Sequence, residues 1–206
     1  MAKLNAPLFS FSATGKLADA LVYFAWKGLN VVRSYAVPAN PKTTAQTTHR
    51  GYLTEAVTAT HAAQALAAQP LAEDDTSAYS LWASISAKPR TWFNQICKNN
   101  IDQRVAALRG AIYRAGLTTP GALSLAVEVY FTTVSGANSI TAGNFHYGTS
   151  KTALINTKAA TVLEAKLSAT IDGLTAGVKY YWQFRPSAHA DYVGAYSGIY
   201  YGVPTA

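Results

Sequence analysis

The chain has very little of what marks a disulfide scaffold or a cysteine-dependent enzyme. It contains one cysteine in 206 residues, and only 13% of its residues are charged. A single cysteine cannot form a disulfide within the chain. Cys97 lies among Phe93, Ile96 and Ile101 at helical spacing, so we expect it to be buried as a small apolar side chain. Because 50% of the residues are hydrophobic, the low charge also excludes a largely disordered chain.

Long apolar runs are missing as well. No stretch approaches the roughly 18 consecutive apolar residues of a membrane-spanning helix. After Lys3, Asp19 and several polar residues interrupt the sequence, so no secretory signal is expected. These absences predict a soluble protein with no export signal and no association with a membrane.

Recognisable catalytic and metal-binding patterns are absent too. The histidines His49, His61, His146 and His189 are far apart, whereas zinc needs three or four convergent ligands. The acidic run 73–75 fits a helix start better than a metal site, because carboxylates are favoured at the positive end of a helix dipole. No Gly-x-Ser-x-Gly elbow and no phosphate-binding glycine loop occurs. We therefore expect no enzymatic activity, no cofactor and no metal.

Acidic residues are scarce at the start of the chain, although the net charge is only +7 overall. Before Glu55 there is one acid, Asp19, against six basic residues: Lys3, Lys16, Lys27, Arg33, Lys42 and Arg50. From residue 121 onward five bases face four acids. The excess indicates either an affinity for an acidic surface or a solvated, solubilising face, and both interpretations stay open.

What is present begins with alternating aromatic and β-branched runs at 8–11, 20–26 and 29–35. The run 14–16 and the pair Lys27-Gly28 separate them as turns, which predicts a hairpin near Lys27-Gly28. A two-stranded ribbon is marginally stable alone in water, so we expect this ribbon to dock on the following helices or on a neighbouring subunit.

Three helices are expected next, after an extended connector around Pro38 and Pro41. Thr43 with Gln46 fits a capping box for the first helix, which should end before Pro70. The second should begin near 73–75. The third should begin near Thr91 and run, with a break at 99–100, as far as Ile112.

The composition changes at 116–121, a Gly- and Pro-containing stretch that is typical of a linker. Beyond it, period-two runs separated by turns predict about seven strands, as in a β-sandwich. The expected fold class is α+β. It comprises a basic β-ribbon or anchor arm (1–42), a small helical bundle (43–116) and an all-β sandwich (121–206).

The first part of the chain combines a Gly-Lys pair, an aromatic hairpin, a basic residue and an Asn-Pro-Lys-Thr-x-x-Gln-x-x-x-Arg segment. These positions are Gly15, Lys16, Tyr23, Trp26, Gly28, Arg33, Asn40, Pro41, Lys42, Thr43, Gln46 and Arg50. Together with the segments 71–82 and 92–100, the pattern resembles a family of small structural proteins of tailed bacteriophages and prophages. The resemblance implies a virion structural protein.

The last part of the chain resembles a fibronectin type III module. The resemblance lies in 147–150, in 171–177 and in Tyr180-Tyr181-Trp182, where Tyr180 or Tyr181 would be the tyrosine of the corner motif. It implies an all-β sandwich.

We therefore expect a virion component, either a capsid decoration or cement protein or a head–tail or tail component, whose partners are other virion proteins and copies of itself. Aromatic and arginine side chains carry much of the binding energy at interfaces. The candidate interface residues are Tyr23, Trp26, Lys27, Arg33, Asn40, Pro41, Lys42 and Arg50.

Two alternatives stay open. Interleaved bases and aromatics are also typical of proteins that bind single-stranded nucleic acid, so the chain could be a virion protein that contacts DNA. The sandwich could instead belong to a host-surface or glycan-binding adhesin, with four aromatic residues as platforms: Trp182, Tyr192, Tyr196 and Tyr200.

Overall fold

The computed structural model describes residues 3–4, 13–17, 20–37, 39, 42–134, 140–187 and 190–206. The chain divides into two compact units, Met1–Thr43 and Thr44–Ala206. The described residues form a mixed α+β structure with three α-helices and three antiparallel sheets.

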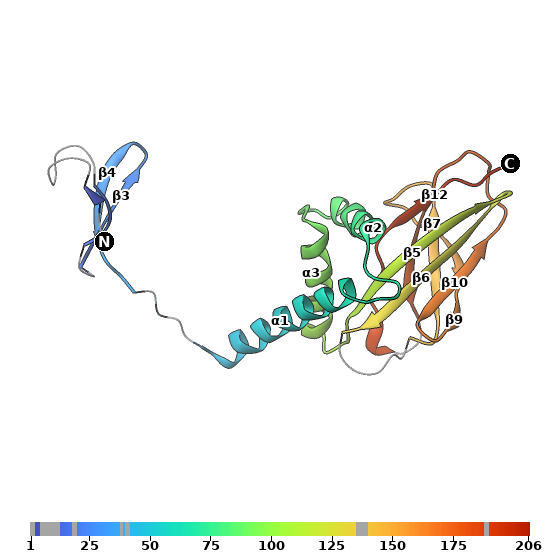
Figure 1. Ribbon diagram of the computed structural model, residues 1–206, viewed down its shortest axis with the longest axis horizontal. Helices are drawn as coiled ribbons and strands as arrows, with labels where there is room; N and C mark the ends of the chain where they lie inside the picture. The colour runs from blue at the N-terminus through green and yellow to red at the C-terminus, as the bar shows by residue number, and fades with distance from the viewer. Residues whose placement is uncertain are drawn as a thin grey trace. The chain divides into compact units, whose positions relative to one another are not determined.

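The N-terminal unit is a sheet of four short antiparallel strands in the order β1-β2-β3-β4 (Figure 1). The strands are β1 (Lys3–Leu4), β2 (Ala13–Leu17), β3 (Leu21–Trp26) and β4 (Leu29–Ser34). The predicted hairpin is confirmed, because Lys27 and Gly28 join β3 to β4 with φ angles of 49° and 81°. Two positive φ angles are the signature of the type I′ turn, whose twist matches that of the strands.

Three expectations for this unit need correction or lie outside the described residues. The ribbon is not two-stranded, since β1 and β2 extend it. The expected turn at 14–16 is wrong, because Gly15 and Lys16 pair with Tyr23 and Val22 within the sheet. Gly15 has a φ of 107°, a conformation that glycine adopts readily. The glycine at this position therefore marks a local backbone distortion inside a strand and not a turn. The run expected at 8–11 lies outside the described residues.

The second unit begins with three helices close to their expected positions: α1 (Thr44–Gln64), α2 (Glu73–Ser84) and α3 (Trp92–Val105). The α3 helix begins after Thr91, whose side chain accepts a 3.3 Å hydrogen bond from the Asn94 amide, as an N-cap residue does. It continues through 99–100, where a break was expected. None of the described helices is both long enough and apolar enough to cross a membrane.

The expected helical continuation to Ile112 and the expected linker at 116–121 are both wrong. These residues form the long strand β5 (Ala111–Gly121). The pairing of β5 with its neighbour shifts register between Arg114 and Leu117, next to the positive φ of Ala115 (49°). Glycine and proline there mark an irregular edge strand, in which both residues are tolerated. The separate helical and sandwich domains (43–116 and 121–206) consequently belong to one compact unit.

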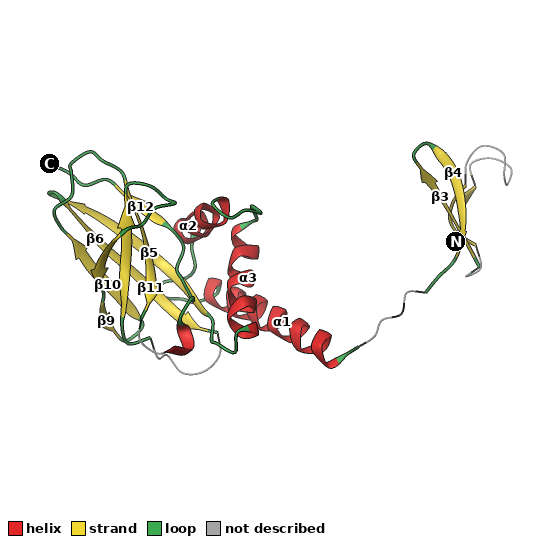
Figure 2. Cartoon of the chain, turned by 180° about the vertical axis from the view of Figure 1, so that it is seen from behind, coloured by secondary structure: helices red, strands yellow, loops and turns green. Residues whose placement is uncertain are grey.

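The remaining strands complete a β-sandwich of two four-stranded antiparallel sheets, in the orders β5-β6-β10-β9 and β12-β11-β7-β8 (Figure 2). Their bounds are β6 (Ser124–Thr133), β7 (Gly143–Gly148), β8 (Asn156–Ala159), β9 (Thr161–Leu163), β10 (Lys166–Ile171), β11 (Tyr180–Pro186) and β12 (Tyr200–Gly202). Strand β6 shows strict alternation, with Leu125, Val127, Val129 and Phe131 buried in the core. A single residue, Ala160, separates β8 in one sheet from β9 in the other.

The helices pack beside the sandwich around a second apolar cluster that includes Leu71, Tyr79, Ile96 and Ile112. The α2 helix contacts both β5 and β12, the outer strands of the two sheets. Because α2 lies against these outer strands, it hinders the strands of other molecules from pairing with their free backbone groups. Contact is close at Gly198, where an added Cβ would lie 2.8 Å from two Ala78 atoms. A glycine is therefore required at this position.

Because three tyrosines are buried, we expect the protein to lose stability at high pH. Burial raises the pKa of Tyr79, Tyr113 and Tyr200 above the ordinary value of 10.0, and the Asp75 charge adds to the effect on Tyr200. Above pH ~10 the unfolded chain loses these protons while the folded chain keeps them, so the free energy of unfolding falls as pH rises further.

We expect these three tyrosines to ionise only as the protein unfolds. Tyrosinate absorbance and circular dichroism, followed together during an alkaline titration, check this. Ionisation of all thirteen tyrosines with native circular dichroism retained would contradict it.

Candidate functional site

One face of the N-terminal sheet gathers exposed aromatic and aliphatic side chains. In the β3–β4 hairpin, Trp26 pairs with Leu29, Phe24 with Val31 and Val22 with Arg33. Residues directly opposite each other in antiparallel strands project to the same side, so these six share one face. Trp26 is 60% exposed and Leu29 is 68% exposed, which leaves much of this apolar surface in contact with solvent. We call this set the hairpin face.

The hairpin face carries two basic side chains, its own Arg33 and the neighbouring Lys16. The Arg33 guanidinium lies 5.5 Å from the centroid of the Phe24 ring. The Lys16 ammonium lies 4.0 Å from the centroid of the Tyr35 ring, and Lys16 pairs with Val22 across the sheet. Cation–π contacts of this kind hold the charges over an apolar surface. The face therefore combines exposed apolar area with fixed positive charge.

The N-terminal unit buries little of itself. Among its described side chains only Tyr23 is buried, at 7% exposure, and it points to the opposite face of the sheet from Trp26. Monomeric proteins rarely leave a contiguous apolar patch open unless the patch binds something. An exposed tryptophan and an arginine on one apolar face are typical of the composition of interface centres.

The structure separates the predicted interface residues into different settings. Trp26 and Arg33 lie on the hairpin face, Lys27 is exposed in the turn, and Lys42 is exposed after the sheet. Arg50 is exposed in α1 and so belongs to the second unit. Asn40 and Pro41 lie outside the described residues. Tyr23 is the exception, because its burial makes it a packing residue.

The aromatic platforms considered for glycan binding are largely used by the core. Trp182, Tyr192 and Tyr200 are buried, at 0%, 0% and 6% exposure. Tyr196 is half-buried, with the Arg185 guanidinium 5.0 Å from its ring. Four side chains that support the fold cannot together present a binding surface.

The other candidate reactive groups are also structural. Cys97 is buried as expected, and burial raises the pKa of its thiol, which keeps it protonated and unreactive. Within the ranges that the structure describes, no three His, Cys, Asp or Glu side chains cluster as a metal site would require.

Sequence reasoning missed the role of Asp75. Its carboxylate is fully buried and accepts four hydrogen bonds, from the amides of Ala72 (2.9 Å), Ala115 (2.8 Å) and Gly116 (2.9 Å) and from the Tyr200 hydroxyl (2.8 Å). Its partners come from the start of α2, from the irregular part of β5 and from β12. The carboxylate therefore joins the helical layer to the outer strands of both sheets.

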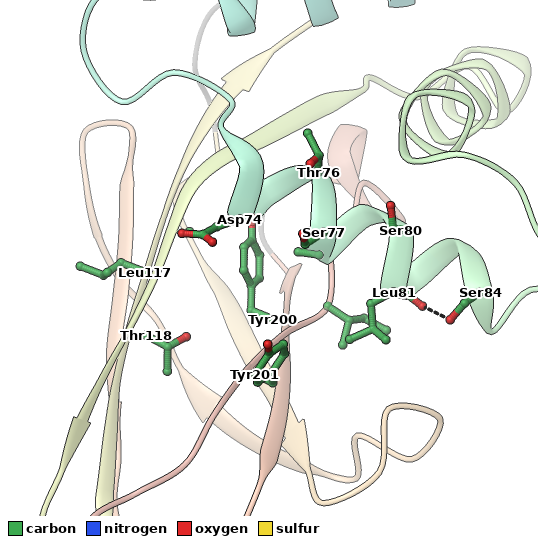
Figure 3. A pocket seen from close by; sticks show the side chains of 13 residues that line it. Asp74, Thr76, Ser77, Ser80, Leu81, Ser84, Leu117, Thr118, Tyr200 and Tyr201 are labelled. Carbon is green, nitrogen blue, oxygen red and sulfur yellow. Dashed lines mark hydrogen bonds between the residues drawn. The ribbon is translucent and has the colours of Figure 1, made fainter.

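Beside this network lies a groove of about 690 Å³, shown in Figure 3. The α2 helix forms one wall, and residues of β5 and β12 form the other. Seven of its lining residues carry hydroxyl groups: Thr76, Ser77, Ser80, Ser84, Thr118, Tyr200 and Tyr201. The sequence signal that could have indicated it is the spacing of Asp74, Ser77, Leu81 and Ser84, which places all four on one helix face.

Comparison with known proteins adds no assignment: no family model matches the chain, and no curated protein and no solved structure matches it.

Proposed function

We propose that this chain is a non-enzymatic structural component of a tailed-phage virion, acting as a capsid decoration or cement protein or as a head–tail or tail component. It docks through its basic N-terminal sheet onto an acidic surface of a neighbouring virion protein. The observation that carries the proposal is the hairpin face, on which Trp26 and Leu29 are more than half exposed and which also carries Arg33.

The choice of an acidic protein partner rests on charge and exposure together. Five bases, Lys3, Lys16, Lys27, Arg33 and Lys42, lie in the N-terminal unit against the single acid Asp19. Two copies meeting through this unit would bring like charges together, which disfavours self-pairing there. A nucleic acid would satisfy the bases but would leave the aliphatic Leu29 and Val31 with nothing apolar to cover them. A protein surface with an apolar centre and an acidic rim satisfies both features.

The second unit supports the finer proposal of a fibronectin type III-like module. Its two sheets match the immunoglobulin-type arrangement of A, B, E and D strands opposite C, F and G strands, with one strand added beside C. At the start of β11 the Tyr180 hydroxyl accepts a 3.2 Å hydrogen bond from the Thr175 amide, five residues upstream. This is the geometry of a tyrosine corner, and it favours Tyr180 over Tyr181 for that role.

Quantitative mass spectrometry of gradient-purified phage particles tests the proposal. We expect the chain to be present in a fixed ratio to the major capsid protein. A ratio near one indicates a decoration or cement protein, and a ratio of a few hundredths indicates a neck, tail or baseplate component. Absence from particles refutes the virion assignment.

Trp26→Ala tests the docking face more specifically. Removing a half-exposed interface tryptophan should lower the number of copies per particle about tenfold or more at limiting expression. Tyr201→Ala is the matched control, because Tyr201 is a similarly exposed aromatic residue (54%) in the second unit. Equal incorporation of the two variants would exclude the hairpin face as the docking surface.

A further inference from the structure

The β4 strand forms an edge of the N-terminal sheet. Among the described strands it pairs with β3 alone, through all six of its residues and without a register shift. A sheet edge carries a row of backbone amide and carbonyl groups with which another strand can pair, and proteins commonly block it with proline, lysine or a bulge. The β4 strand contains no proline and no lysine, and its regular pairing shows no bulge.

The geometry of the hairpin decides which backbone groups of β4 face outward. A two-residue turn joins β3 to β4, so the two residues that flank the turn bond to each other through their backbones. Bonding and non-bonding positions then alternate along β4. The alternation holds as far as Tyr35, whose amide donates a 2.7 Å hydrogen bond to the Ala20 carbonyl. The backbone groups of Val32 and Ser34 consequently point away from β3.

These outward groups are open to a partner. In the part of the chain that the structure describes, the Val32 and Ser34 amides have no hydrogen-bond partner. Both residues are exposed, Val32 at 44%. A strand laid beside β4 could therefore form main-chain hydrogen bonds without displacing any that the sheet already has.

The side chains of β4 on the hairpin face indicate which strand would fit. Leu29 and Val31 extend the apolar surface to the edge of the sheet, and Arg33 follows them. Directly opposite side chains on neighbouring strands interact. An added strand would gain most from apolar residues opposite Leu29 and Val31 and from an acidic residue opposite Arg33. The matching segment has these three residues at every second position.

A second copy of the chain fits this edge less well. Its own β4 would bring a second Arg33, and its N-terminal unit has five bases against one acid. Like charges brought together across an interface weaken association. A nucleic acid has no peptide groups with which to continue the sheet. An extended segment of a different, acidic protein satisfies both the backbone and the charge.

We propose that the chain docks by strand addition, in which an extended segment of a neighbouring virion protein, with alternate apolar and acidic residues on one face, pairs with β4. Main-chain bonds to Val32 and Ser34 provide affinity, and the hairpin face selects the segment. This inference rests on the proposed docking of the N-terminal unit. It adds the mode of docking and the chemistry of the partner.

Val32→Pro tests the role of the outward amide. Proline removes this donor and places its ring toward the added strand, whereas the bonds between β4 and β3 do not involve the Val32 amide. Val32→Ala is the matched control, because it shortens the same side chain and keeps the amide. At limiting expression, we expect about tenfold or fewer copies of Val32→Pro per particle and Val32→Ala within about twofold of the wild type.

Hydrogen exchange of the wild-type chain gives a second measurement that needs no variant. The Val32 and Ser34 amides should exchange rapidly in the isolated chain, because they have no partner there. In purified particles, strand addition should slow both amides about tenfold or more. Mass spectrometry with fragmentation of the labelled peptides resolves the two positions.

The outcomes separate the mode of docking from the docking itself. Absence of the wild-type chain from particles overturns both proposals. Where Trp26→Ala lowers incorporation, equal incorporation of the two Val32 variants overturns strand addition and leaves docking through the hairpin face. Equal exchange of the two amides in both states also overturns strand addition. Protection that is present in the isolated chain and lost on dilution would indicate pairing between copies, against the proposed partner.

Discussion

Replacing Asp75 with alanine should lower the free energy of unfolding by about 4 kcal/mol, roughly a thousandfold change in the ratio of folded to unfolded protein. The substitution removes the acceptor of four hydrogen bonds and leaves three backbone amides and the Tyr200 hydroxyl without their partner. Buried donors without partners cost far more than the net worth of the bonds they made. Urea unfolding followed by circular dichroism measures the change.

Asp74 provides the matched control for this prediction. It is the neighbouring carboxylate on the same helix, and it is exposed. Asp74→Ala should change the free energy of unfolding by no more than about 0.5 kcal/mol. Asp75→Asn should also be destabilising, because an amide nitrogen cannot accept the bonds that one carboxylate oxygen now receives. Equal stability of the Asp74 and Asp75 variants would show that the network contributes little.

Deleting residues 1–43 should abolish incorporation into particles while leaving the rest of the protein folded. Both apolar clusters belong to Thr44–Ala206, so the truncated chain keeps its core. Removing the hairpin face removes the proposed anchor. We expect at least an approximately 100-fold loss of incorporation, equal to roughly 2.8 kcal/mol of docking free energy.

Two measurements together decide this prediction. Thermal unfolding of the truncated chain should show a single cooperative transition close to that of the full chain, because both apolar clusters lie within Thr44–Ala206. Mass spectrometry of particles grown with the truncated chain measures incorporation. Normal incorporation of a folded truncation would place the anchor elsewhere in the protein.

Local sequence signals located most of the helices and the hairpin. Thr91 marked the start of α3, and the acidic run 73–75 marked the start of α2. Lys27-Gly28 marked the tight turn. Each of these signals acts within a few residues, through a cap, a helix dipole or a required positive φ, and is therefore readable from the sequence.

The boundary between helices and sandwich could not be read in this way. Ile112 continues an apolar spacing that suits a helix, but its position is decided by pairing with Thr132 on β6. Gly116 and Pro120 resemble a linker in composition, yet they lie in an edge strand where both are tolerated. Such pairings depend on residues distant in the sequence, and these override local preference.

The residues of the candidate sites also differ in whether nearby or distant residues determine their positions. The exposed Trp26 and Arg33 follow from a short hairpin with too few residues to cover its own aromatic side chains. The buried positions of Trp182 and Tyr192 depend on which strands face each other across the core, and Asp75 depends on partners 40 and 125 residues away. A sequence pattern contains no direct record of those distances.

The 125 residues between Asp75 and Tyr200 also set a delay during protein synthesis. At elongation rates of about 5–20 residues per second, the Asp75 carboxylate leaves the ribosome roughly 6–25 s before the hydroxyl that completes its shell. During that interval the carboxylate stays hydrated, and the start of α2 is not yet fixed to the sandwich. Final assembly of the second unit is thus a late event, completed only when the β12 strand has emerged.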